Sequence, residues 1–328
     1  MSRVEGQEAP ERRWAILTSI PGVAAAVELR QGRGLSLMLS NPPRVSVLKV
    51  AQDFVPEIES TTPRPRYPYI VAADSSGLIL VCASHPSDWW RNTAMSRIDP
   101  QLIIEENLKF NTYILCDATT RTVSRLPARV RPEPPILYSG NVGLIGRDDG
   151  QFMVAELQAE AGNNRAVLFC HLVGTAAWVR KVLDYSPDNP KWGHNGVISH
   201  GGELWWVDLS YGLLACDPFA EQPVLRYVPL PEGCVVPATA RRPFPAVDTA
   251  LMTIDRRCCV RLSDGRLRYV QIDLDAPVIR MWTLTNPENA EWTLEYAVNF
   301  AEIWTDRSNR TPGRCLNRQV NAPEVVPQ

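Results

Sequence analysis

The sequence lacks the patterns that mark most enzymes, membrane proteins and exported proteins. No stretch approaches the ~18 uninterrupted apolar residues of a membrane-spanning helix, and residues 1–13 contain no apolar segment typical of a signal peptide. A Cys-x-x-Cys pair, a Walker phosphate loop and a Gly-x-Ser-x-Gly element are also missing, and Gly32-Arg-Gly34 is only half of a dinucleotide-binding fingerprint. We therefore expect a cytoplasmic or nuclear protein with no membrane partner and no recognisable catalytic, cofactor-binding or metal-binding residues.

The chain also lacks a large excess of either positive or negative charge. The chain has 34 Lys and Arg against 36 Asp and Glu, a formal net charge of −2, so no overall field favours a nucleic-acid partner. Eight cysteines are spread along the chain, and most of them lie in apolar segments, as Cys82, Cys116, Cys170 and Cys216 do. We expect these thiols to be free and to act as small core residues.

A glycine-centred phrase is present four times. Each copy has two apolar segments joined by a short polar turn whose pivot is Gly77, Gly150, Gly202 or Gly265. Glycine adopts positive φ without steric cost, so such turns between apolar runs predict β-hairpins. A propeller blade takes roughly 40–50 residues, and insertions near 89–107 and 229–245 would account for the wider spacing of these pivots.

A second phrase follows the hairpins. Cys116-Asp117 and Cys216-Asp217 each end an apolar segment, and a later segment closes at Leu126-Pro127 or Leu230-Pro231. A looser copy has a first segment that ends at Cys170-His171 and a second one over 178–183. Each copy is typical of a third strand, a turn and an outer strand that stops at a proline. The predicted fold is all-β, a β-propeller-like array of four-stranded antiparallel blades.

The predicted domain is single and spans residues 14–306. Residues 1–13 and 307–328 lack a strand pattern and are expected to be disordered tails. Only 99–108, and with less support 161–167, could form helices.

Tryptophans supply the main candidates for partner contact. Trp89 and Trp90 lie among polar residues in an insertion, which fits a contact surface better than a core strand. Trp205 and Trp206 are neighbours on a predicted strand, so their side chains point to opposite faces. We expect one of them to pack between blades and the other to face solvent or a partner.

His194, His200 and Asp208 form the most notable polar group. Two histidines beside a hairpin with a carboxylate nearby could bind a metal or act as an acid and a base. The alternative is that both histidines simply occupy loops and turns, because no third ligand is indicated. Asp273 and Asp275 alternate on one strand, but two carboxylates are too few for calcium.

Five strand phrases resemble a known family. They are Trp14-Ala-Ile-Leu17, Pro42-Pro43-Arg-Val-Ser46, Ala73-Asp74 with Gly77-Leu-Ile-Leu80, Tyr113-Ile-Leu-Cys-Asp117 with Leu126-Pro127, and Met281-Trp282-Thr-Leu284 with Glu291-Trp292. They look like the plant proteins of domain of unknown function 1618, a family greatly expanded in grasses. The resemblance covers roughly residues 14–306. It implies a propeller-like fold related to the domains associated with F-box proteins, and it brings no active site.

This chain differs from that family in two features, one at each end. Only thirteen residues precede Trp14, which is too few for an F-box. Family members usually continue with a further strand segment where this chain has its tail, which leaves open a truncated or alternatively spliced form with an incomplete last blade.

The sequence thus predicts a non-catalytic protein-interaction module with an unidentified protein partner. The alternative is an enzyme whose polar or metal-assisted site lies in the propeller channel, around His194, His200 and Asp208.

Overall fold

Strands dominate the structure, as predicted. It is a computed structural model that describes residues 15–25, 29, 34–55, 68–83, 112–128, 141–159, 164–187, 192, 195–235, 257–273 and 277–305. Within these residues the strands form five four-stranded sheets. The helical elements bounded there are short, the 3-10 turn η2 (Gln52–Phe54) and α4 (Phe300–Thr305). No helix in the described ranges is long and apolar enough to span a membrane.

The second to fifth sheets are antiparallel meanders in which each strand pairs with the next one in the chain. The second sheet consists of β5 (Tyr69–Ala73), β6 (Leu78–Cys82), β7 (Tyr113–Asp117) and β8 (Thr122–Arg125). The third consists of β9 (Val142–Gly146), β10 (Phe152–Ala159), β11 (Arg165–Leu172) and β12 (Val179–Asp184). The fourth consists of β13 (Val197–His200), β14 (Glu203–Asp208), β15 (Gly212–Cys216) and β16 (Arg226–Pro229). The fifth consists of β17 (Cys258–Ser263), β18 (Arg266–Asp273), β19 (Val278–Asn286) and β20 (Glu291–Asn299).

The four predicted hairpins open these four sheets. Their pivots, Gly77, Gly150, Gly202 and Gly265, all have positive φ. In the fifth sheet Asp264 and Gly265 have φ of 49° and 69° and join the paired residues Ser263 and Arg266. Positive φ at both central positions is the two-residue turn whose twist matches that of the flanking strands.

The prediction for the second phrase is also confirmed, because its first segment forms the third strand of a sheet. Cys116, Cys170 and Cys216 lie on β7, β11 and β15 and are buried. None of the seven described cysteines is in a disulfide. The weaker helix prediction for 161–167 is wrong over its described part, because β11 begins at Arg165 and pairs with both β10 and β12. The other predicted helix, 99–108, lies outside the described residues.

The first sheet departs from the meander. It consists of β1 (Ile16–Leu17), β2 (Gly22–Ala24), β3 (Leu35–Met38) and β4 (Val45–Ala51). β1 and β2 pair with β4 in parallel, and β3 pairs with it antiparallel. The last sheet has all four strands, so the irregular unit is the first sheet and not the last.

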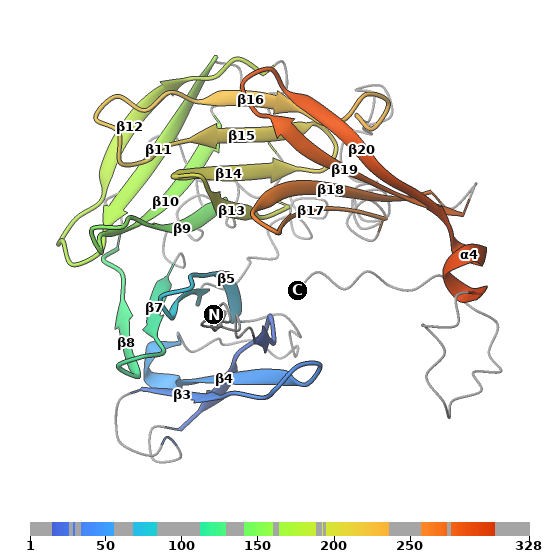
Figure 1. Ribbon diagram of the computed structural model, residues 1–328. Coiled ribbons are helices and arrows are strands. Elements are labelled where there is room, and N and C mark those ends of the chain that lie inside the picture. The colour runs from blue at the N-terminus through green and yellow to red at the C-terminus, as the bar shows by residue number, and fades with distance from the viewer. Residues whose placement is uncertain are drawn as a thin grey trace, which may run out of the picture.

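The sheets follow one another in chain order around an arc that does not close (Figure 1). The first strands of the later sheets meet near its centre, since β5 contacts β9 and β13, and β13 contacts β9 and β17. The arrangement is therefore blade-like, and each sheet packs face to face with the next. Four hydrophobic clusters fill the successive junctions from the first sheet to the fifth.

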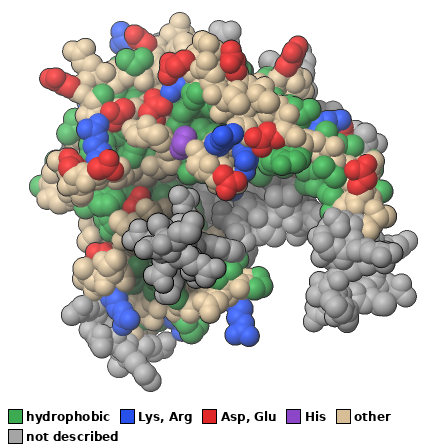
Figure 2. All heavy atoms as spheres, viewed as in Figure 1, with side chains coloured by type: hydrophobic (Ala, Val, Ile, Leu, Met, Phe, Trp, Pro, Cys, Tyr) green, Lys and Arg blue, Asp and Glu red, His purple; other side chains and the backbone are tan. Residues whose placement is uncertain are grey.

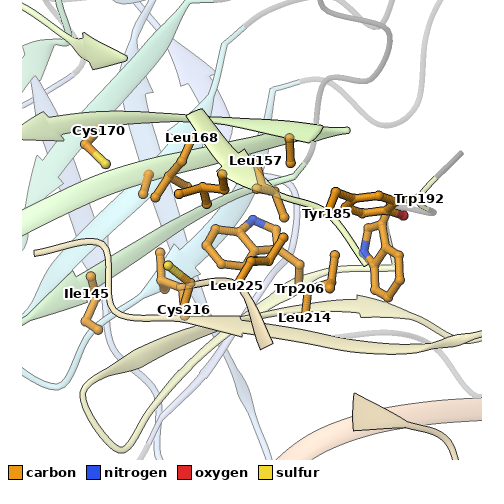
Figure 3. Packing of buried hydrophobic residues seen from close by; sticks show 14 of the residues in the cluster. Ile145, Leu157, Leu168, Cys170, Tyr185, Trp192, Trp206, Leu214, Cys216 and Leu225 are labelled. Carbon is orange, nitrogen blue, oxygen red and sulfur yellow. The ribbon is translucent and has the colours of Figure 1, made fainter. Parts of the chain in front are cut away.

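The tryptophan pair on β14 is buried on both sides. Trp206 is 0% exposed and packs between the third and fourth sheets, among Leu157, Leu168 and Leu225 (Figure 3). Trp205 is 2% exposed and packs between the fourth and fifth sheets. The expectation that one ring faces solvent or a partner is wrong, because both faces of an inner sheet of the array are interior.

Candidate functional site

The meander gives the array two unlike faces. In each of the second to fifth sheets, two connections lie on one side, which we call the turn face. They are the hairpin turn between the first and second strands and the connection between the third and fourth strands. Connections from second to third strands, and from each sheet to the next, lie on the opposite side, which we call the loop face. Because consecutive strands run in opposite directions, this division follows from the strand order alone.

Three long connections belong to the loop face. The segments 84–111, 129–140 and 236–256, which lie outside the described residues, each join strand ends on that side. The connection that contains Trp89 and Trp90 leaves the second sheet after Ala83 and returns at Thr112. There the Ala83 amide donates a hydrogen bond to the Thr112 carbonyl, at 2.8 Å. The position of the two tryptophans themselves lies outside the described residues.

A buried carboxyl group lies toward the loop face, between the second and third sheets. Glu156 on β10 is 0% exposed. The Tyr113 hydroxyl donates to its Oε2 at 3.0 Å, and the Gln158 amide donates to its Oε1 at 2.6 Å. Tyr69 lies in the same junction, where burial first, then Cys82 and Glu156, raise the pKa of its hydroxyl. These contacts fasten β7, where the Trp89 and Trp90 connection ends, to the third sheet.

Asp208 holds a comparable position between the third and fourth sheets. It is 3% exposed at the end of β14, and its Oδ1 accepts hydrogen bonds from the Ser210 amide at 2.9 Å and the Ser210 hydroxyl at 2.6 Å. Burial and the Asp208 carboxylate raise the pKa of the neighbouring Tyr185 hydroxyl. Asp208 therefore shapes the turn between β14 and β15.

An aromatic group encloses the same corner. Trp192 packs edge-on against Tyr211 and Tyr227, with ring centroids 6.0 and 6.3 Å away, and Figure 3 shows it beside Tyr185. Its buried Nε1 has no hydrogen-bond partner among the described residues. The ring planes meet at 88° and 89°, the edge-to-face arrangement that aromatic pairs prefer.

The structure does not bring His200 and Asp208 together. His200 ends β13 at the turn face, opposite Glu203, whereas Asp208 ends β14 at the loop face. Five residue steps of strand separate these ends, or about 17 Å at about 3.4 Å per residue. His194 lies outside the described residues. The backbone carbonyl of His200 accepts a hydrogen bond from Trp205 Nε1 at 3.1 Å.

Within the described ranges, no group of three His, Cys, Asp or Glu side chains is placed to hold a metal ion. Asp273 is paired with Arg280, at 3.1 Å, and Asp275 lies outside the described residues. On the side of the molecule shown in Figure 2, acidic and basic side chains are interspersed, in keeping with the small net charge. Nothing in these contacts favours the enzyme alternative.

Comparison with known families agrees with the resemblance carried by the strand phrases. The family described as protein of unknown function (DUF1618) matches residues 206–327. Over these residues the match supports the resemblance to this family. The DUF1618 match begins at Trp206 on β14, takes in the rest of the fourth sheet and the whole fifth sheet, and runs past the last described residue. It assigns no activity.

Other comparisons add little to the DUF1618 match. No curated protein matches the chain. Among solved structures, the complex of the fission yeast SREBP-SCAP binding domains aligns over 98% of this chain and 83% of that chain, at 10% identity and a TM-score of 0.25. A similarity this low supports no argument about fold or partner.

Sequence reasoning missed the buried polar side chains on β10. Glu156 and Gln158 interrupt an apolar run and share one face of the strand with Val154. Polar residues spaced by two inside an otherwise apolar strand were the available signal, because a buried polar group needs hydrogen-bond partners nearby.

Proposed function

We propose that this chain is a non-catalytic protein-interaction module that binds a protein partner through its loop face. The observation that supports this is the gathering of the long connections on one side of a stack of packed sheets. Rigid sheets that present loops on one side are a common basis for docking.

Trp89 and Trp90 are the proposed anchors of this contact. They belong to a connection that leaves and returns on the loop face, where Ala83 and Thr112 are hydrogen-bonded. Tryptophans near the centre of an interface often account for most of its binding energy. We further propose that the module works in the cytoplasm or nucleus of a plant cell, on the basis of the family resemblance and of the free, buried cysteines.

The experiment compares partner recovery and stability in matched variants. We expect Trp89→Ala/Trp90→Ala to reduce recovery of specific partners from a plant extract at least fivefold by quantitative mass spectrometry, a loss of about 1 kcal/mol or more. Its melting temperature should stay close to that of the parent protein. The control is Val224→Ala, a residue 78% exposed on the turn face, which should change neither quantity.

Two results would overturn the proposal. If Trp89→Ala/Trp90→Ala melts well below the parent, the insertion belongs to the core. If its partner set equals that of the parent while its stability is intact, the two tryptophans are not the contact.

A further inference from the structure

Two cysteines stand at the two ends of the connection 236–256. Cys234 follows the fourth sheet, where its amide donates a hydrogen bond to the Pro231 carbonyl at 2.9 Å. Cys258 is the first residue of β17. Neither cysteine is in a disulfide, and both are almost buried, with 8% and 9% of each residue exposed. Both lie toward the loop face.

The two side chains meet around Gln271. Cys258 is the cross-strand partner of Gln271 on β18, so their side chains share one face of the sheet at neighbouring positions. The Cys234 thiol donates a hydrogen bond to Oε1 of the same glutamine, at 3.6 Å. Both cysteines also belong to the hydrophobic cluster between the fourth and fifth sheets.

The Tyr269 hydroxyl lies beside both sulfurs. Burial first, and then the Cys258 and Cys234 thiols, raise its pKa. Within the described residues this buried hydroxyl has no hydrogen-bond partner of ordinary geometry. Both thiols therefore act on the same buried hydroxyl, which places them at one point of the junction.

We propose that Cys234 and Cys258 are a redox pair that forms an intramolecular disulfide when the protein meets a hydroperoxide. The thiolate of one cysteine attacks the O–O bond, which gives a sulfenic acid and releases an alcohol, or water when the oxidant is hydrogen peroxide. The second thiol then attacks the sulfenic sulfur, the S–S bond forms and water leaves. The two thiols lose two electrons and two protons, and the peroxide is reduced.

The disulfide would join the two ends of the connection 236–256 at the loop face. If the loop face is the partner-binding side, oxidation also changes partner binding, and that consequence alone rests on the proposed function. The covalent bond can be tested without any partner.

Oxidation is expected to be slow at neutral pH. Burial and the neighbouring Cys258 raise the pKa of Cys234 to about 11, although Tyr269 and Arg280 act in the opposite direction. The thiolate is the reactive form, so the rate should rise about tenfold per pH unit until the pH nears the pKa. This pH dependence distinguishes the buried pair from exposed thiols.

A matched control pair lies in the junction between the third and fourth sheets. Burial first, and then the neighbouring Cys170, raise the pKa of Cys216 to about 12. Burial, opposed by Lys181, raises the pKa of Cys170 to about 11. In each pair one thiol donates a hydrogen bond, here Cys170 to the Pro218 carbonyl at 3.7 Å. The difference is that Cys170 and Cys216 are less exposed, at 2% and 0%. We expect this pair to remain reduced.

The test treats the full-length protein with hydrogen peroxide and maps disulfides by mass spectrometry after blocking free thiols. We expect a peptide pair linked through Cys234 and Cys258, its loss in Cys234→Ser and in Cys258→Ser, and its retention in Cys170→Ser. A thiol reductant should reverse the link, and the melting temperature of the oxidised protein should exceed that of the reduced protein. Melting curves of the reduced serine variants establish that they fold.

Three outcomes would contradict the proposal. They are the absence of the link after complete oxidation of a model thiol in the same solution, a predominant link to any other cysteine, and a rate that does not change with pH. None of these outcomes bears on partner recovery by the Trp89 and Trp90 variants, so failure of this inference and failure of the proposed function are separable.

Discussion

At the scale of single residues, buried polar side chains are satisfied by neighbours on adjacent strands and sheets. Glu156 can lie at 0% exposure because a tyrosine from the second sheet and a glutamine two residues further along β10 both donate to it. An acceptor left without such donors would cost about 1–3 kcal/mol. The contact therefore stabilises the junction between the second and third sheets.

Removing one donor should be measurable. We predict that Tyr113→Phe lowers the free energy of unfolding by about 1–2 kcal/mol, because the carboxyl group loses a hydrogen bond and stays buried. Urea unfolding of the purified protein provides the measurement. Tyr296→Phe, at a residue 59% exposed on β20, is the control and should change stability by less than about 0.5 kcal/mol.

His171 makes stability depend on pH. It is 2% exposed on β11 beside Trp178, with ring centroids 5.2 Å apart. Burial lowers the pKa of His171 below its ordinary value, although the contact of its ring with the Ala177 carbonyl acts in the opposite direction. An unfolded histidine titrates near about 6.5, so the unfolded chain binds a proton more readily than the folded protein.

The unfolding free energy should consequently fall as the pH drops through about 6.5 toward the folded pKa, by at most about 1.4 kcal/mol per pH unit. We predict that His171→Phe flattens this slope between about pH 5 and pH 8. His200→Gln is the control and should keep it. A parent protein equally stable throughout that range would show that His171 does not contribute.

At the scale of elements, β14 illustrates what an inner sheet of the array requires. Trp205 and Trp206 project into different hydrophobic clusters, and each indole also donates a hydrogen bond, to the His200 carbonyl at 3.1 Å and the Asn141 carbonyl at 2.8 Å. One strand therefore joins two inter-sheet junctions.

Truncation of either ring should destabilise the protein strongly. We predict that Trp205→Ala and Trp206→Ala each cost about 3–5 kcal/mol in urea unfolding, the usual range for a buried tryptophan. Val224→Ala, on the exposed turn between β15 and β16, should cost less than about 0.5 kcal/mol. A small effect at either tryptophan would mean that its junction is not packed as described.

Two glycines should respond differently to alanine. A Cβ at Gly143 on β9 would lie 2.6 Å from Val197 Cγ1 in the next sheet, whereas a Cβ at Gly265 would meet nothing within 4 Å. We predict a cost of about 1–3 kcal/mol from overpacking for Gly143→Ala. Gly265→Ala should cost about 1 kcal/mol because its φ is positive.

A further substitution at each site tests whether overpacking or backbone strain is the cause. Chemical denaturation gives the free energy of unfolding of each variant. Val197→Ala should offset part of the Gly143→Ala cost by making room. Gly265→Asn should be milder than Gly265→Ala, since asparagine tolerates positive φ. A Gly265→Asn variant less stable than Gly265→Ala would contradict the backbone explanation.

Local chemistry determined what could be predicted from the sequence. The pivots at Gly150 and Gly265 and the third strands around Cys116 and Cys216 depend on turn preferences and apolar runs within a few residues, so they were foreseen. The parallel pairing of β1 with β4 depends on residues far apart in the chain, and it was not. The distance between His200 and Asp208 could not be read from the sequence, because it depends on which ends of β13 and β14 carry them.

At the scale of the whole molecule, each sheet depends on its neighbour. The face of the fourth sheet that carries Trp205, Leu213 and Val228 is covered by Val260 and Tyr269 of the fifth. In stacked arrays of this kind, stability comes largely from interfaces between adjacent units.

Loss of the last sheet should thus be costly. We predict that a variant ending at residue 235 exposes the apolar face of the fourth sheet and aggregates or loses cooperative unfolding, as judged by size-exclusion chromatography and thermal melting. The full chain under the same conditions is the reference. A monomeric truncated variant with an unchanged melting temperature would show that the sheets are independent.

The pairing of each strand with its successor has a consequence for synthesis on the ribosome. From β5 to β20, every sheet contains all its hydrogen-bonding partners within one contiguous stretch of chain. A sheet can therefore form as soon as that stretch has left the exit tunnel, before the next one is translated. The apolar face that will pack against the following sheet then stays exposed until that sheet forms. Pauses in translation between sheets are therefore the moments at which the nascent chain most needs protection by chaperones.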